Sequence, residues 1–162
     1  MSGKRLLLLA LVLACALAAL VATAPAGAQS AEATKCIAYA VLKPGNEVRP
    51  ADTTDPVESR ALGAALVAVN GTKLSFSVAI FNPARETFVA GHIHAGAAGA
   101  NGPVVVSLFG GSANPRLFVQ VGQVDIEADV AAAICRDLAG HYVNYHTTQD
   151  PQGAVRGQLV AG

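Results

Sequence analysis

Apolar and polar residues alternate along much of the chain, in short segments separated by turn-forming residues. The clearest segment is 73–80, where every second residue from Leu74 to Ile80 is apolar. A period of two turns one set of side chains toward a core and the other toward water, as in an antiparallel strand. Asn70-Gly71, just before this segment, is a strong signal for a tight hairpin turn. The pattern therefore predicts a β-hairpin around these two residues.

The same pattern predicts about eight short strands and one short helix for the whole domain. The expected strands are 35–42, 59–69, 73–80, 88–94, 104–109, 117–121, 141–147 and 154–160. The expected helix is 125–138, where Asp125 can cap the N-terminus and Gly140 follows the C-terminus. Many short strands joined by turn-rich connections predict an all-β fold, an antiparallel, Greek-key-like β-sandwich.

The first 28 residues follow a different pattern. Two basic residues precede an apolar run over 6–21, and Ala26 and Ala28 have the spacing that signal peptidase recognises. The run holds about 16 residues, fewer than the roughly 20 that a membrane-spanning helix needs. The pattern predicts a signal peptide over 1–28 and an exported protein, secreted or periplasmic, with no membrane span after cleavage.

Lipid anchoring is the alternative for this segment. Val12-Leu13-Ala14-Cys15 is similar to a lipobox, in which Cys15 would carry the lipid. The second residue of the motif fits poorly, and the residues after the cysteine stay apolar instead of forming a polar tether. Cleavage after Ala28 is the favoured prediction, with a leader over 29–35 and one domain over 36–162.

Removal of the signal peptide leaves 134 residues with 9 basic and 11 acidic side chains. Because no basic patch is available to hold phosphates, no nucleic-acid partner is expected. Two cysteines remain, Cys36 and Cys135, and an even count in an exported domain predicts a disulfide. Two buried free thiols are the alternative. A bridge would close a loop of about 100 residues, for which chain entropy gives up to about 4–5 kcal/mol.

Three of the four histidines fall where strand alternation can bring them together. His92 and His94 are two residues apart, so both side chains point to one side of a strand. His146 can join them from a later strand, whereas His141 would lie on the opposite face. Three neutral imidazoles can bind copper or zinc, with an affinity that falls as pH drops through about 6.5. In the alternative, the rings hydrogen-bond backbone carbonyls of the Gly-rich loop 95–103 and only stabilise the fold.

Three segments form an ordered set of motifs. They are Leu42-Lys43-Pro44-Gly45-Asn46-Glu47-Val48-Arg49-Pro50; Gly91-His92-Ile93-His94 followed by Asn101-Gly102-Pro103-Val104-Val105; and Tyr142-Val143-Asn144-Tyr145-His146-Thr147 followed by Val155-Arg156-Gly157-Gln158-Leu159. Over residues 36–160 the chain resembles the CHRD domain, a module named from repeats in chordin and found in many bacterial exported proteins. Arg49 stands where the family usually has a proline, and Ala154 where it usually has Glu.

The resemblance implies an all-β extracellular or periplasmic domain without an established enzymatic activity. Because Glu47 and Arg156 both lie in family motifs, they are expected to form an ion pair between the first and last strands. An anionic ligand on Arg156 is the alternative, since a buried guanidinium needs a counter-charge. No Gly-Lys-Ser/Thr follows the glycines of 95–103, and no serine or threonine lies in a nucleophile motif. No catalytic residue is therefore assigned.

These observations leave three functions open. The first is an exported, non-enzymatic binding or cell-envelope interaction module, whose partner would be a protein or envelope ligand that the sequence does not identify. The second is a copper- or zinc-binding protein that uses the three histidines. The third is a purely structural exported domain.

Overall fold

The computed structural model describes residues 34–49 and 55–162. The predicted signal peptide, its cleavage site, Cys15 and most of the expected leader lie outside these residues. Within them, no helix is long and apolar enough to cross a membrane.

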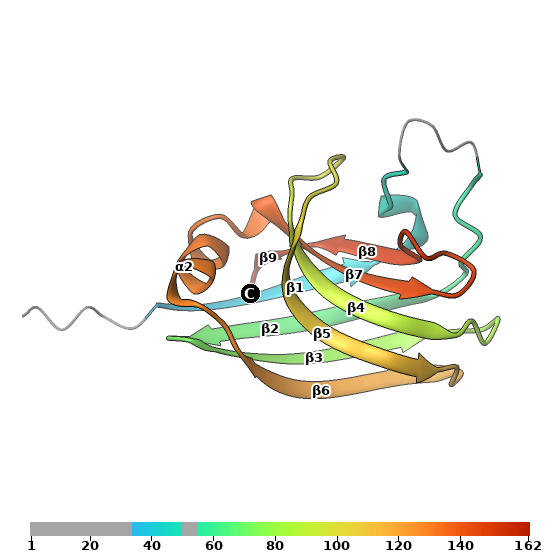
Figure 1. Cartoon of the computed structure of the whole chain (residues 1–162), viewed down its shortest axis with the longest axis horizontal. Coiled ribbons are helices and arrows are strands. Elements are labelled where there is room, and N and C mark those ends of the chain that lie inside the picture. The colour runs from blue at the N-terminus through green and yellow to red at the C-terminus, as the bar shows by residue number, and fades with distance from the viewer. Residues whose placement is uncertain (1–33, 50–54) are drawn as a thin grey trace, which may run out of the picture. The chain divides into compact units, whose positions relative to one another are not determined.

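Within these described ranges, nine strands form two antiparallel sheets accompanied by one α-helix, which confirms the predicted all-β sandwich (Figure 1). The five-stranded sheet has the order β6-β3-β2-β1-β9 and comprises β1 (Lys35–Leu42), β2 (Leu62–Asn70), β3 (Lys73–Phe81), β6 (Leu117–Asp125) and β9 (Val160–Ala161). The four-stranded sheet has the order β5-β4-β7-β8 and comprises β4 (Phe88–Ala95), β5 (Val104–Ala113), β7 (His141–Thr147) and β8 (Val155–Gln158). The predicted hairpin joins β2 to β3: Asn70 pairs with Lys73, and Gly71 and Thr72 form the turn between them.

The core lies between the inner faces of the two sheets, as the alternation predicts. On β3, Leu74, Phe76, Val78 and Ile80 are buried while the residues between them face outward. An aromatic group from both sheets fills one part of the core, with the Phe88 ring 5.1 Å from the Phe118 ring, centroid to centroid. Each sheet therefore keeps an outer face, and the two outer faces differ in chemistry.

The last predicted strand, 154–160, is divided between the two sheets. Val155 to Gln158 pair with β7, whereas Val160 pairs with β1 in the other sheet. Leu159, between the two pairings, is fully buried. The chain end therefore ties the sheets together, and the structure has nine strands where about eight were expected.

The helix begins later than predicted. Asp125 ends β6 and forms an ion pair with Lys73 instead of capping a helix. The helix α2 spans Ala128–Arg136, and Glu127 occupies the N-cap without a side-chain hydrogen bond. Two short 3-10 turns complete the regular structure, η1 (Pro44–Asn46) and η2 (Leu138–Gly140).

The predicted disulfide is present. Cys36 on β1 and Cys135 on α2 are bridged, with their Cα atoms 5.5 Å apart. The alternative of two free thiols is thereby excluded. The bridge holds α2 against the end of the five-stranded sheet, where Figure 1 shows the helix beside the start of β1.

Candidate metal centre

Three histidines meet on the outer face of the four-stranded sheet. The strands β4 and β7 are neighbours, and His92 lies opposite Asn144 while Ala90 lies opposite His146. One ring nitrogen from each of His92, His94 and His146 lies within 4.8 Å of the other two. The structure thus brings together the three residues that strand alternation selected.

His141 lies apart from this cluster. It is buried, and its Nδ1 lies 2.7 Å from the backbone oxygen of Asp137, to which it donates a hydrogen bond. It therefore fixes the connection between α2 and β7. This placement makes His141 a matched control for the clustered histidines.

The hydrogen bonds of the cluster define which ring nitrogens carry a lone pair. The Nδ1 atom of His94 lies 2.9 Å from the carbonyl oxygen of Gly102, and that of His146 lies 3.1 Å from the oxygen of Pro151. A carbonyl oxygen only accepts, so both Nδ1 atoms carry the hydrogen and both Nε2 atoms keep a lone pair. The Nε2 of His146 lies 3.2 Å from the Nδ1 of His92.

The Nε2 atom of His94 stands out among these groups. It is buried, and no described residue offers it a hydrogen-bond partner. Buried polar atoms in proteins are nearly always partnered, and an exception indicates an unmet interaction. The chemistry of this atom, a lone pair on a neutral imidazole, is that of a metal ligand.

The electrostatics of the cluster keep the rings neutral. Burial, with smaller effects of His92 and His94, lowers the pKa of His146 to about 4, against the opposing hydrogen bond to Pro151. Burial also lowers the pKa of His92, with His94 adding to the effect. The pKa of His94 is lowered by burial and by the charge of Arg156, against the opposing bond to Gly102. Near pH 7 all three imidazoles are therefore uncharged.

A stack across three strands fixes the orientation of His94. Its ring lies parallel to that of Tyr142 on β7, with 4.8 Å between centroids and 6° between planes. On β8, the guanidinium carbon of Arg156 lies 3.4 Å from the centroid of the same tyrosine ring. Aromatic stacking and a cation over a ring face both favour this arrangement.

The Gly-rich loop, residues 95–103, covers this part of the sheet. Gly102 contributes its oxygen to His94 and its backbone N–H to the Tyr142 hydroxyl. A Cβ atom on Gly102 would lie 1.5 Å from the oxygen of Ala95, so only glycine fits at this close approach. Gln158 donates to the oxygen of Gly96. The histidine bond to the loop is the contact that the structural alternative expected, yet it leaves the second nitrogen of His94 available.

The expected ion pair between Glu47 and Arg156 is not formed as a direct contact. Arg156 is buried, and its guanidinium donates to the oxygens of Ala97 and Ala100 and to the side chain of Asn101. The carboxylate of Glu47 instead accepts from Asn144 at 3.3 Å.

Burial explains why the pair does not form. It raises the pKa of Glu47 to about 8, which outweighs the lowering by Arg156, Asn144 and Arg49, so the carboxyl is mostly protonated near pH 7. A neutral acid supplies no counter-charge, and Arg156 is stabilised by carbonyl oxygens and a ring face instead. With those acceptors in place, Arg156 offers little to an anionic ligand.

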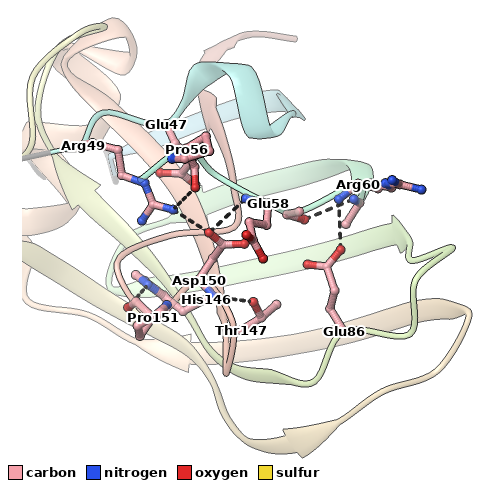
Figure 2. A network of polar contacts seen from close by, with 12 residues as sticks. Glu47, Arg49, Pro56, Glu58, Arg60, Glu86, His146, Thr147, Asp150 and Pro151 are labelled. Atoms are coloured by element: carbon pink, nitrogen blue, oxygen red, sulfur yellow. Dashed lines mark hydrogen bonds and ion pairs between the residues drawn. The ribbon is translucent and has the colours of Figure 1, made fainter. Parts of the chain in front are cut away.

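A second polar network lies beside His146, and Figure 2 shows it. Arg49 forms an ion pair with Asp150, whose carboxylate also accepts from the backbone of Glu58. Asp150 is buried, and it directly precedes Pro151, the acceptor of His146. The sequence did not predict the ion pair of Arg49 and Asp150, because the two residues lie 101 positions apart. Arg49 was notable only because it occupies a position where a proline was expected.

Comparison with known proteins gives one match, to a protein family. A family model described as "CHRD domain" matches residues 38–159. No curated protein matches the chain, and no solved structure does. The matched region runs from the second half of β1 to Leu159 and includes the histidine cluster, Tyr142 and Arg156. The chain belongs to the CHRD domain family.

Proposed function

We propose that this chain is an exported, non-enzymatic binding module that holds a copper or zinc ion on His92, His94 and His146. The observation that carries the proposal is the buried Nε2 of His94, which has no partner and faces a cluster of two further neutral imidazoles. CHRD membership supports the coarser part, a binding domain, and the geometry supports the finer part, the metal.

The spacing of the nitrogens is close to that of a metal site. Ligands about 2.0–2.1 Å from a tetrahedral ion lie about 3.4 Å from one another. The Nδ1 atom of His92 lies 3.2 Å from the Nε2 atom of His146, and the ligand nitrogens of the three histidines all lie within 4.8 Å of one another. Small ring rotations would therefore close the set around an ion.

The surrounding bonds also match those of a metal centre. Metal-binding histidines usually donate their second ring nitrogen to a carbonyl or carboxylate, which fixes ring orientation and tautomer. His94 and His146 already do so, toward Gly102 and Pro151. Only His92 would need to change tautomer, because its Nδ1 donates to the lone pair of His146 in the metal-free arrangement.

The donor set selects the class of metal. Three imidazole nitrogens without a thiolate suit Zn(II) and Cu(II), whereas Ca²⁺ and Mg²⁺ prefer oxygen ligands. Three protein ligands leave a further coordination position for water or an external donor. The predicted signal peptide and the disulfide support a secreted or periplasmic setting for such a protein.

Calorimetric titration with Cu(II) and Zn(II) at about pH 7.5 tests the proposal on wild type, His94→Ala and His141→Ala. We expect binding in wild type, loss of binding in His94→Ala and unchanged binding in His141→Ala. Both substitutions remove a buried histidine that donates to a backbone oxygen, so they carry a comparable structural cost.

Thermal unfolding of the same three proteins, with and without metal, provides the check on folding. The metal should raise the unfolding temperature of wild type and His141→Ala only, because it stabilises a state it binds. Absence of binding in wild type, or equal loss in both variants, would contradict the proposal and leave the histidines with a purely structural role.

A further inference from the structure

The outer face of the five-stranded sheet is apolar. Eleven large apolar side chains in the described part of the chain are exposed, and all except Val104 lie on this face. They are Ile37, Tyr39, Val41, Leu62, Leu66, Phe81, Leu117, Val119, Val121 and Val160. A one-sided antiparallel sheet normally turns polar residues to water, and large contiguous apolar patches mark interaction sites.

The register shows how this apolar face is shaped. One row across the sheet reads Val41, Ala64, Ala79 and Val119, so large residues on β1 and β6 flank small ones on β2 and β3. The next row places Leu66 and Ser77 between Tyr39 and Val121. A shallow, almost wholly apolar hollow of about 440 Å³ lies beside Leu66 and Val121. The apolar face is thus uneven: Ala64 and Ala79 form a low row between Val41 and Val119, whereas Leu66 stands above the sheet beside the hollow.

We propose that a second copy of this chain packs on the apolar face, with large side chains of each copy entering the hollow of the other, to form a symmetric dimer. The ten exposed side chains offer on the order of 800 Å², the share that each partner contributes to a standard stable interface. Two sheets can pack face to face at about 10 Å in the way that this domain's own sheets do. A two-fold axis uses the same patch on both copies, so a single self-complementary face is sufficient.

The charged residues of this face favour a protein over a lipid surface. Across one end of the apolar face runs a polar row of Lys35, Asn70, Lys73 and Asp125. Lys73 forms an ion pair with Asp125, which leaves Lys35 as the one lysine of this row outside an ion pair among the described residues. Membrane-surface binding relies on several uncompensated Lys and Arg beside the apolar residues. A row that holds both signs of charge can instead pair with the same row of a second copy across a two-fold axis.

Sedimentation equilibrium of the exported protein at micromolar concentrations tests this inference, on wild type, Leu66→Lys, Val121→Lys and Val104→Lys. The control is matched, because Val104 on β5 is 49% exposed and Leu66 is 50% exposed. We expect a wild-type dimer, retained in Val104→Lys. In Leu66→Lys and Val121→Lys the dissociation constant should rise at least about tenfold, because a charge is buried without a partner.

Three outcomes would overturn the inference. They are a monomer in wild type, a dimer that persists in both variants of the apolar face, and a monomer that binds lipid vesicles through Leu66 and Val121. Since these positions are exposed on a formed sheet, all variants should fold, which circular dichroism and thermal unfolding verify.

Discussion

The fold accommodates two ionisable side chains near the candidate site, Glu47 and Arg156, in different ways. Burial holds Glu47 as a neutral acid, whereas the guanidinium of Arg156 is surrounded by oxygen acceptors and an aromatic face. The difference follows from their partners: Arg156 has three hydrogen-bond acceptors, and one oxygen of Glu47 is buried without a partner. Each residue therefore leads to its own prediction.

Substitution of Glu47 by Gln should change how stability depends on pH. The pKa of Glu47 rises from an ordinary value of 4.5 to about 8 on folding, so the folded state holds a proton that the unfolded state has lost between these values. This contribution weakens the fold as pH rises from 4.5 to 8. Relative to wild type, Glu47→Gln should gain stability across that range in urea denaturation. A constant difference between the two proteins would contradict the assigned pKa.

Arg156→Ala should cost at least about 2 kcal/mol, because several buried oxygens lose a charged donor. Glu47→Ala should cost less than about 1 kcal/mol, because the carboxyl is already desolvated and poorly paired. Urea denaturation of both variants and of the double variant measures the coupling between them. Equal, large costs with strong coupling would instead indicate the direct ion pair that the structure does not form.

Metal binding by this cluster should persist to lower pH than metal binding by exposed histidines. The lowered pKa values of the three rings mean that fewer protons compete with the ion between about pH 6.5 and 4. The metal affinity should therefore begin to fall only below about pH 6.5, whereas the sequence alone predicted a fall centred on that pH. Titration of zinc at several pH values measures this. A midpoint at 6.5 would show that the rings are not shielded from water.

At the scale of elements, strand alternation predicted which histidines share a face because its period of two is strict. His92, His94 and His146 depend only on the parity of β4 and β7, and the structure agrees. The division of the last strand at Leu159 could not be predicted, because crossing between sheets is a tertiary event with no local signal. The stack of His94, Tyr142 and Arg156 requires three adjacent strands, and strand order is not encoded in periodicity.

The structure differs from the sequence predictions at the start of the helix and at Glu47 for a similar reason. Asp125 has the right chemistry for an N-cap, but pairing of β6 with β3 extends the strand through it and places it beside Lys73. Glu47 and Arg156 have opposite ordinary charges, and only burial in the fold reverses the protonation of the acid. Local preference was overridden in both places by contacts far apart in sequence.

The disulfide between β1 and α2 should make a measurable contribution to stability. Replacement of Cys36 and Cys135 by serine should lower the free energy of unfolding by up to about 4–5 kcal/mol, because the bridge spans 99 positions. Urea denaturation, compared with reduced wild type, measures the effect. Unchanged stability, or two titratable thiols in the unreduced protein, would contradict a formed bridge.

At the scale of the whole molecule, the sandwich carries two outer faces with different chemistry. The histidine cluster lies on the outer side of the four-stranded sheet, and the apolar face is the outer side of the five-stranded sheet. The buried core lies between the two sheets and separates the two faces. Metal binding and self-association are thus expected to be independent.

Leu66→Lys should therefore leave zinc and copper affinity within about threefold of wild type while it weakens the dimer. Conversely, His94→Ala should leave the dimer intact while it removes metal binding. Calorimetry and sedimentation on the same preparations give both quantities. A tenfold loss of metal affinity in Leu66→Lys would mean that the site needs the second copy.

X-ray absorption spectroscopy of the zinc- or copper-loaded protein is the decisive test of the metal centre, because it observes the ligands of the ion. We expect imidazole nitrogens at about 2.0–2.1 Å. That signal should be lost in His94→Ala and unchanged in His141→Ala. A coordination shell without imidazole, or one that His94→Ala leaves intact, would contradict a metal centre at His92, His94 and His146.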